Sequence, residues 1–160
     1  MNIFDTIING ASEFFTNYAL ICVISAWLIA QILKGITGAF QKKKFNLVEF
    51  IVGCGGMPSS HSAAVMALAI ASFIQYGVGS FQFTVSIVLA IIVMRDASGV
   101  RRETGEQAKV INQLVQERDE TKDPDIDAEL KELIGHTPLQ VFIGAILGCI
   151  VPFIFWGIML

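Results

Sequence analysis

Two uncharged stretches of the chain are long enough to predict membrane-crossing helices. Residues 14–33 carry no charged side chain over 20 positions. Because an α-helix rises about 1.5 Å per residue, this segment matches the roughly 30 Å hydrocarbon core of a bilayer. Residues 138–160 are also uncharged and are rich in Ile, Phe and Leu. The pattern therefore predicts a first and a last membrane-crossing helix.

A third uncharged stretch, residues 50–94, is too long for a single crossing. It is interrupted at residues 77–80 by Gly-Val-Gly-Ser, which is a turn signal. We therefore predict two crossings here, at roughly 60–76 and 80–95. A chain of 160 residues is expected to form one domain, so the fold class is an all-α integral membrane bundle of about four transmembrane helices over residues 1–160.

Composition agrees with a membrane protein and argues against several other classes. Hydrophobic residues make up 54% of the chain and charged residues 16%, with a mean hydropathy of +0.64. The net charge of −3 offers no whole-chain attraction for a phosphate backbone, so no nucleic-acid partner is expected. Cys22, Cys54 and Cys149 lie in apolar sequence without metal-ligand spacing, so neither a disulfide framework nor a zinc site is indicated.

The loop Lys and Arg residues fall in two segments, 41–44 and 95–136. Short basic loops stay in the cytosol, so both segments are expected there, with both chain termini outside. The second segment predicts an amphipathic helix over 104–118, from apolar residues at helical spacing. A second short helix is expected between Pro124 and Gly135. The acidic side chains of this segment lack the spacing of a calcium loop and are interpreted as solvated.

The chain has two histidines, and the first follows a glycine-rich segment. His61 comes directly after Gly55-Gly56-Met57-Pro58-Ser59-Ser60, where glycine permits close backbone approach and Ser59 or Ser60 can cap the next helix. The free amides of a capped helix start can bind an anion. The same residues could instead serve only to turn the chain and cap the helix, which leaves the histidine unexplained.

The second histidine, His136, precedes the last predicted helix and lies four residues before Gln140, which can orient its imidazole. Taken alone, a charged side chain at a helix end can simply extend to the headgroups. Together, arginine and lysine donors suit a phosphate. Four further ionisable residues are expected at the membrane boundary where the two histidines lie: Lys34, Asp96 as a supporting residue, Arg101 and Arg102. The sequence therefore predicts an electropositive pocket for a phosphate ester at this boundary.

These segments resemble the motifs of a known superfamily. Pro58-Ser59-Ser60-His61 is similar to the Pro-Ser-Gly-His motif of the phosphatidic acid phosphatase type 2 and vanadium haloperoxidase superfamily. The segment from His136 to Val141 resembles its His-x-Pro-x-Asp-Val motif. The likeness is greatest to the divergent branch described as acid phosphatase/vanadium-dependent haloperoxidase-related. It covers nearly the whole chain, including Gln31-x-x-Lys34 and Asp96-x-x-Gly99-Val100-Arg101-Arg102.

The resemblance implies a helical bundle in which one histidine attacks phosphorus and forms a phosphohistidine, while a second protonates the leaving group. No metal or other cofactor is implied. His136 would be the nucleophile and His61 the general acid. Phosphate would be bound by Lys34 and by the serines of the first motif, Ser59 and Ser60.

Two positions depart from the superfamily pattern. Gln140 stands where the aspartate partner of the nucleophile is expected, and Leu130 stands where an arginine is expected. Arg101 or Arg102 can take the place of that arginine. Ser60 replaces the motif glycine and keeps its backbone amide.

The expected function is a lipid-phosphate or polyprenyl-phosphate phosphatase or phosphotransferase in a bacterial plasma membrane, with its site facing the cytosol. Its partners would be membrane lipid and a phosphorylated lipid substrate. One alternative is a catalytically degenerate protein that binds or moves anionic headgroups. Another is a small scaffold bundle, since Gly144-x-x-x-Gly148 suits close helix packing within the fold or in a homo-oligomer.

Overall fold

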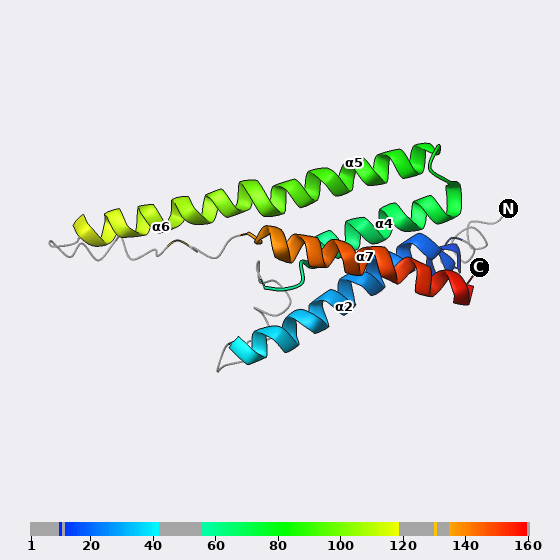
Figure 1. Cartoon of the computed structure of the whole chain (residues 1–160), viewed down its shortest axis with the longest axis horizontal. Helices are drawn as coiled ribbons and strands as arrows, with labels where there is room; N and C mark the ends of the chain where they lie inside the picture. Colours follow the sequence, from blue (N-terminus) through cyan, green and yellow to red (C-terminus); the bar gives the residue numbers. More distant parts are fainter. Residues whose placement is uncertain (1–9, 11, 42–55, 119–129, 131–134, 160) are drawn as a thin grey trace.

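The protein is all-helical over the residues that the computed structural model describes, which are 10, 12–41, 56–118, 130 and 135–159 (Figure 1). The first of these helices crosses the last at an angle, and one long helix extends well beyond the others. The elements are α2 (Tyr18–Gln41), α4 (Ser60–Tyr76), α5 (Phe81–Arg95), the π-helical turn η1 (Asp96–Val100), α6 (Arg101–Arg118) and α7 (Pro138–Met159).

Three helices of the described part are long and apolar enough to cross a membrane. They span Tyr18–Thr37, Phe81–Val115 and Pro138–Met159. These correspond to the first, third and fourth predicted crossings. The second predicted crossing is α4, whose 17 residues give a length of about 25 Å. An all-helical fold with three helices that could span a membrane is therefore confirmed, while a crossing by α4 stays a prediction.

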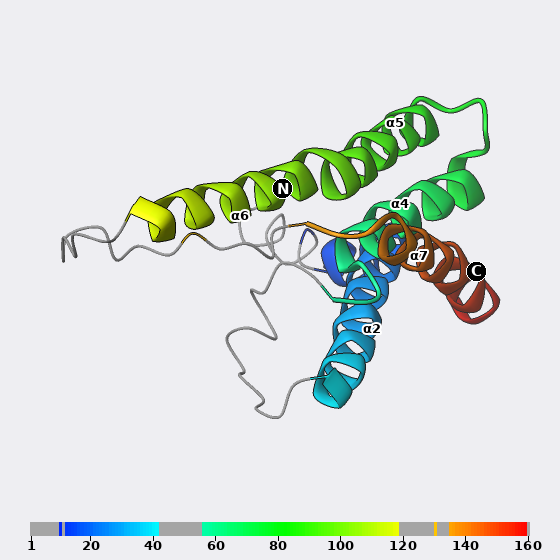
Figure 2. The ribbon, with the colours of Figure 1, turned by 60° about the vertical axis from the view of Figure 1, so that its left-hand side comes forward.

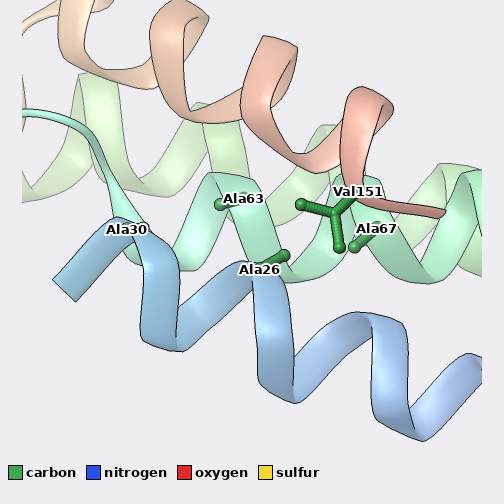
Figure 3. Packing of buried hydrophobic residues seen from close by; sticks show 5 residues of the cluster. All are labelled: Ala26, Ala30, Ala63, Ala67 and Val151. Carbon is green, nitrogen blue, oxygen red and sulfur yellow. The ribbon is translucent and has the colours of Figure 1, made fainter. Parts of the chain in front are cut away.

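α4 is the central helix, because it packs against α2, α5 and α7. Small side chains let helix backbones approach one another closely in a membrane. Figure 3 shows Ala63 and Ala67 of α4 meeting alanines of α2 and Val151 of α7. Contacts with three helices fix the start of α4 relative to them. The buried residues of α4 are all small: Ser60, Ser62, Ala63, Ala67, Ala69, Ala71 and Ser72.

α7 lies directly on α4 through the two glycines of the Gly144-x-x-x-Gly148 motif. A Cβ added to Gly144 would overlap the backbone oxygen of Ser59, and one added to Gly148 would overlap that of Ala63. The sequence left open whether this motif acts within the fold or between subunits. In the structure it packs within the fold, where only glycine permits the approach.

The helix after the third predicted crossing does not stop at the membrane boundary. α5, η1 and α6 form one continuous helix, which leaves the bundle on the far side from the α4–α5 turn (Figure 2). The prediction of a separate helix starting at residue 104 was wrong in its boundary. Residues 95–104 contain no proline and a single glycine, so nothing there ends the helix, and the backbone inserts a π turn instead.

α2 also continues beyond its predicted end at residue 33. The uncharged run of residues 14–33 predicted only the membrane-spanning part, whereas the helix itself continues to Gln41. Lys34 therefore lies inside α2 and continues a stripe of residues four apart, Cys22, Ala26 and Ala30, that is fully buried. The stripe leads from the bundle core to the boundary where α4 and α7 begin.

Some predicted features lie outside the described residues: most of the short helix between residues 124 and 135, the basic run 42–44 and Cys54. One point of the returning segment is described, at Leu130. The side chain of Asn112 in α6 donates to the Leu130 backbone oxygen at 2.9 Å and accepts from its backbone nitrogen at 3.0 Å. This pair of bonds holds the chain against α6 shortly before it reaches Gly135.

Candidate active site

Both histidines line one small pocket at the end of the bundle where α4 and α7 begin. Their ring centroids are 6.4 Å apart and the rings are inclined at 72°. His136 is 6% exposed, whereas His61 is much more accessible. The packing of α7 on α4 brings the two imidazoles together from distant parts of the chain. The full lining is His61, Val93, Asp96, Ala97, Arg101, Gly135 and His136.

Backbone contacts seat His136 in this pocket. Its backbone nitrogen donates to the Ala97 oxygen at 3.0 Å. Gly135 has φ of +112°, and a Cβ there would lie 2.6 Å from the backbone nitrogen of Arg102. Only glycine tolerates both the left-handed conformation and this close approach. The segment before α7 is thereby fixed against the junction of η1 and α6.

The first motif is joined to the second by a backbone hydrogen bond. The Ser59 nitrogen donates to the Gln140 oxygen at 3.1 Å. As expected, Ser59 is the N-cap of α4, and its hydroxyl accepts from the nitrogen of Ser62 at 3.4 Å and from its hydroxyl at 3.0 Å. The backbone nitrogen and the hydroxyl of Ser59 are therefore both used within the fold. Of the two motif serines, buried Ser60 stays the candidate phosphate donor through its amide.

The π turn directs Asp96 and Arg101 into the same pocket. Residues five apart point about 140° away from each other on an α-helix, whereas a π turn brings them into register. The Arg101 Nε atom donates to Asp96 Oδ2 at 2.6 Å. Arg101 lines the pocket, while Arg102 contributes its backbone to the Gly135 contact. Geometry therefore favours Arg101 over Arg102 as the arginine of the site.

Lys34 of α2 does not line the pocket, but it lies near enough for its positive charge to act on both histidines. Gly56, with φ of +90°, lies over the lysine side chain, because a Cβ there would come within 3.0 Å of the lysine Cγ and Cε. One turn later, the Thr37 hydroxyl donates to the Met57 oxygen at 2.7 Å. α2 thus anchors the segment that leads into α4 and supplies a positive charge beside it.

Gln140 does not orient His136 in this structure, contrary to the sequence expectation. Its Oε1 accepts from the Thr137 backbone nitrogen at 3.0 Å, and its own backbone nitrogen donates to the Thr137 hydroxyl at 3.3 Å. This is a reciprocal capping box, which satisfies the amides at the start of α7. Within the described part of the chain, the buried Nδ1 of His136 has no hydrogen-bond partner.

The surroundings of His136 favour its neutral form. Burial and, to a lesser extent, the neighbouring His61, Lys34 and Arg101 together lower the pKa of His136 from its ordinary 6.5 to about 4. At neutral pH the imidazole therefore carries a free lone pair. A bound anion would find positive charge on Lys34 and Arg101 rather than on this ring.

This pKa makes stability depend on pH in a defined direction. Between about pH 6.5 and 4, His136 is protonated in the unfolded chain but stays neutral in the folded protein. The free energy of unfolding therefore falls as the pH falls through this range. The full effect is about 3 kcal/mol, at 1.36 kcal/mol per pKa unit. We expect the melting temperature of the detergent-purified protein to fall more steeply over this range than that of His136→Gln. Parallel curves for the two proteins would contradict the lowered pKa.

Sequence reasoning missed several residues that build the pocket. Val93, Ala97 and Gly135 line it, and Thr37 anchors the adjacent segment. Only Gly135 had a sequence signal for a place in the pocket, because it precedes His136. From the sequence alone, we interpret this glycine as the end of a short helix. No group of three His, Cys, Asp or Glu side chains that could hold a metal ion occurs among the residues described.

Comparison with known proteins agrees with the motif resemblance. The chain is 40% identical over 152 residues to a Bacillus subtilis (strain 168) protein named "Uncharacterized membrane protein YuiD", covering 89% of this chain and 96% of that protein. No solved structure matches the chain. The model of the Divergent PAP2 family matches residues 15–151. The protein is therefore a membrane protein that belongs to the Divergent PAP2 family.

Proposed function

We propose that the protein is a phosphatase or phosphotransferase that acts on a lipid phosphate or polyprenyl phosphate through a phosphohistidine. The observation that supports this most is the meeting of His61 and His136, 6.4 Å apart, next to the positive charges of Lys34 and Arg101. Two imidazoles and two nearby cations are groups that favour phosphoryl transfer to a histidine.

In the proposed reaction, a lone pair of His136 attacks phosphorus and the P–O bond to the lipid breaks. The departing alkoxide takes a proton from the imidazolium of His61. Water then attacks the phosphohistidine, the P–N bond breaks, the water proton passes to His61, and phosphate leaves. Lys34 and Arg101 stabilise the charge on the transferring phosphoryl group. The low pKa of His136 supports its role as nucleophile, because the ring is neutral at pH 7.

The depth of the pocket supports a lipid substrate. It lies where α4 and α7 begin, at one end of helices that are long enough to cross a membrane. With α4 counted as a fourth crossing, the basic residues near Arg101 support a cytosolic location for this end. A lipid in that leaflet would present its phosphate at the level of the pocket while its tail stays in the bilayer.

The test is phosphate release from a panel of lipid phosphates by the full-length protein in lipid nanodiscs. The panel contains phosphatidate, lysophosphatidate, polyprenyl phosphate and polyprenyl diphosphate. We expect release from at least one of them, and a rapid acid-free quench should trap label on protein in an acid-labile, base-stable form, as phosphohistidine is. Release without such label would contradict the histidine mechanism.

A second candidate is a non-enzymatic protein that binds or moves anionic headgroups. It is favoured by the capping role of Gln140 and by the Nδ1 of His136, which has no carboxylate or other hydrogen-bond partner among the described residues that could stabilise a phosphoimidazole. This candidate predicts saturable binding of lipid phosphate, with no phosphate released from any member of the panel.

A further inference from the structure

The guanidinium of Arg101, which could bind a phosphate, is paired with the carboxylate of Asp96 instead. Arg101 Nε lies 2.6 Å from Asp96 Oδ2, and both side chains line the pocket that holds the two histidines. Neither belongs to the two histidine motifs. A carboxylate beside an anion site weakens anion binding, so its presence there calls for a role of its own.

The ion pair is placed so that it can be exchanged. The side chains of Arg101 and Asp96 are 47% and 39% exposed, and ion pairs of this exposure contribute little to stability. The π turn nevertheless holds both residues toward the pocket, because the Arg101 backbone nitrogen bonds to the Asp96 oxygen five residues earlier. The side-chain pair can therefore break by rotation of the arginine side chain while the helix backbone stays in place.

When the arginine turns to a phosphate, the carboxylate needs a new partner. The cationic groups around the pocket are Lys34 from α2 and Arg101 from α6, and His61 from α4 adds a third when it is protonated. His61 lines the same pocket as Asp96 and is the ring that must carry a proton for the leaving group. A carboxylate beside it holds that proton until transfer.

We propose that Asp96 is a positioning residue that exchanges partners when a phosphate ester binds: Arg101 leaves the carboxylate for the phosphate, and the carboxylate takes the imidazolium of His61. The predicted effect of Asp96 on turnover rests on the proposed function. The exchange of partners changes anion binding and the protonation of His61, and both can be measured without turnover. It assigns to Asp96 the support that Gln140 does not give to either histidine.

The test compares Asp96→Asn with the wild type, using vanadate as the phosphate analogue. Asparagine pairs with neither Arg101 nor His61, and it removes a negative charge from the pocket, so we expect vanadate to bind about two- to fivefold more tightly. In contrast, kcat should fall by about tenfold or more while KM does not rise. Asp96→Glu should recover part of kcat. The matched control is Glu103→Gln, which removes an exposed carboxylate outside the pocket and should change neither quantity.

Protonation can be read directly, because the chain has only two histidines. In ¹⁵N-histidine NMR of the vanadate complex at pH 7, His61 should carry both ring protons in the wild type and lose one in Asp96→Asn, with His136→Gln used for assignment. Weaker vanadate binding by Asp96→Asn, or the same His61 protonation in both proteins, would overturn the exchange. If the wild type releases no phosphate, the proposed enzyme activity fails, while the binding and NMR results still decide the exchange.

Discussion

His136→Gln is expected to lower phosphate release by about a thousandfold or more, because it removes the atom that forms the bond to phosphorus. Glutamine has a similar length and offers polar atoms to the buried position, and His136 has no side-chain hydrogen bond at Nδ1 to lose within the described part of the chain. The fold should therefore persist. Phosphate release from the best lipid of the panel, with the melting temperature measured alongside, checks this.

His61→Gln distinguishes the roles of the two rings. A general acid matters most when the leaving group is a poor one, so the loss with a lipid phosphate should be about a hundredfold or more. With an aryl phosphate, whose leaving group needs no proton, the loss should be much smaller, whereas His136→Gln should be equally inactive on both substrates. Similar losses on both substrates for His61→Gln would argue against its role as an acid.

Gly144→Ala is expected to lower the stability of the protein, because it adds a methyl group where α7 packs directly on the start of α4. The added Cβ would overlap the backbone oxygen of Ser59, so α7 and α4 must separate locally. Overpacking of this kind costs about 1–3 kcal/mol. The same shift strains the bond from Ser59 nitrogen to Gln140 oxygen, one turn away, so lipid-phosphate binding should weaken as well. The melting temperature and lipid-phosphate affinity in nanodiscs are the measurements.

Gly157→Ala is the matched control in the same helix. Nothing lies within 4 Å of a Cβ at Gly157, and alanine is the better helix former, so its stability should stay the same or rise slightly. If the two variants melt at the same temperature, close packing of α7 on α4 at Gly144 is not a source of stability.

The sequence determined the helices and their membrane character. Uncharged runs as long as residues 14–33 and 138–160 have few other stable structures in a bilayer, because a helix satisfies its own backbone hydrogen bonds. The glycine turn at 77–80 divided the middle run correctly into α4 and α5. The two histidines could be singled out because they are the only ones in the chain and lie beside predicted helix ends.

The details of the site depended on contacts that local sequence does not encode. The distance between His61 and His136 follows from the fit of Gly144 and Gly148 against α4, which a pattern of glycines suggests but does not direct to a partner helix. The choice of Arg101 over Arg102 follows from a π turn, since one inserted residue rotates every later side chain.

Gln140 illustrates the same limit. Its spacing from His136 allowed a hydrogen bond to the imidazole, yet the carboxamide caps α7 through Thr137 instead. Both contacts are compatible with four-residue spacing, and the choice between them depends on where the helix begins and which way His136 turns once Ala97 has bound its backbone. Sequence thus determined which residues could form the site, because composition and spacing act locally. Tertiary packing decided which of them meet, because that depends on how four distant segments approach one another.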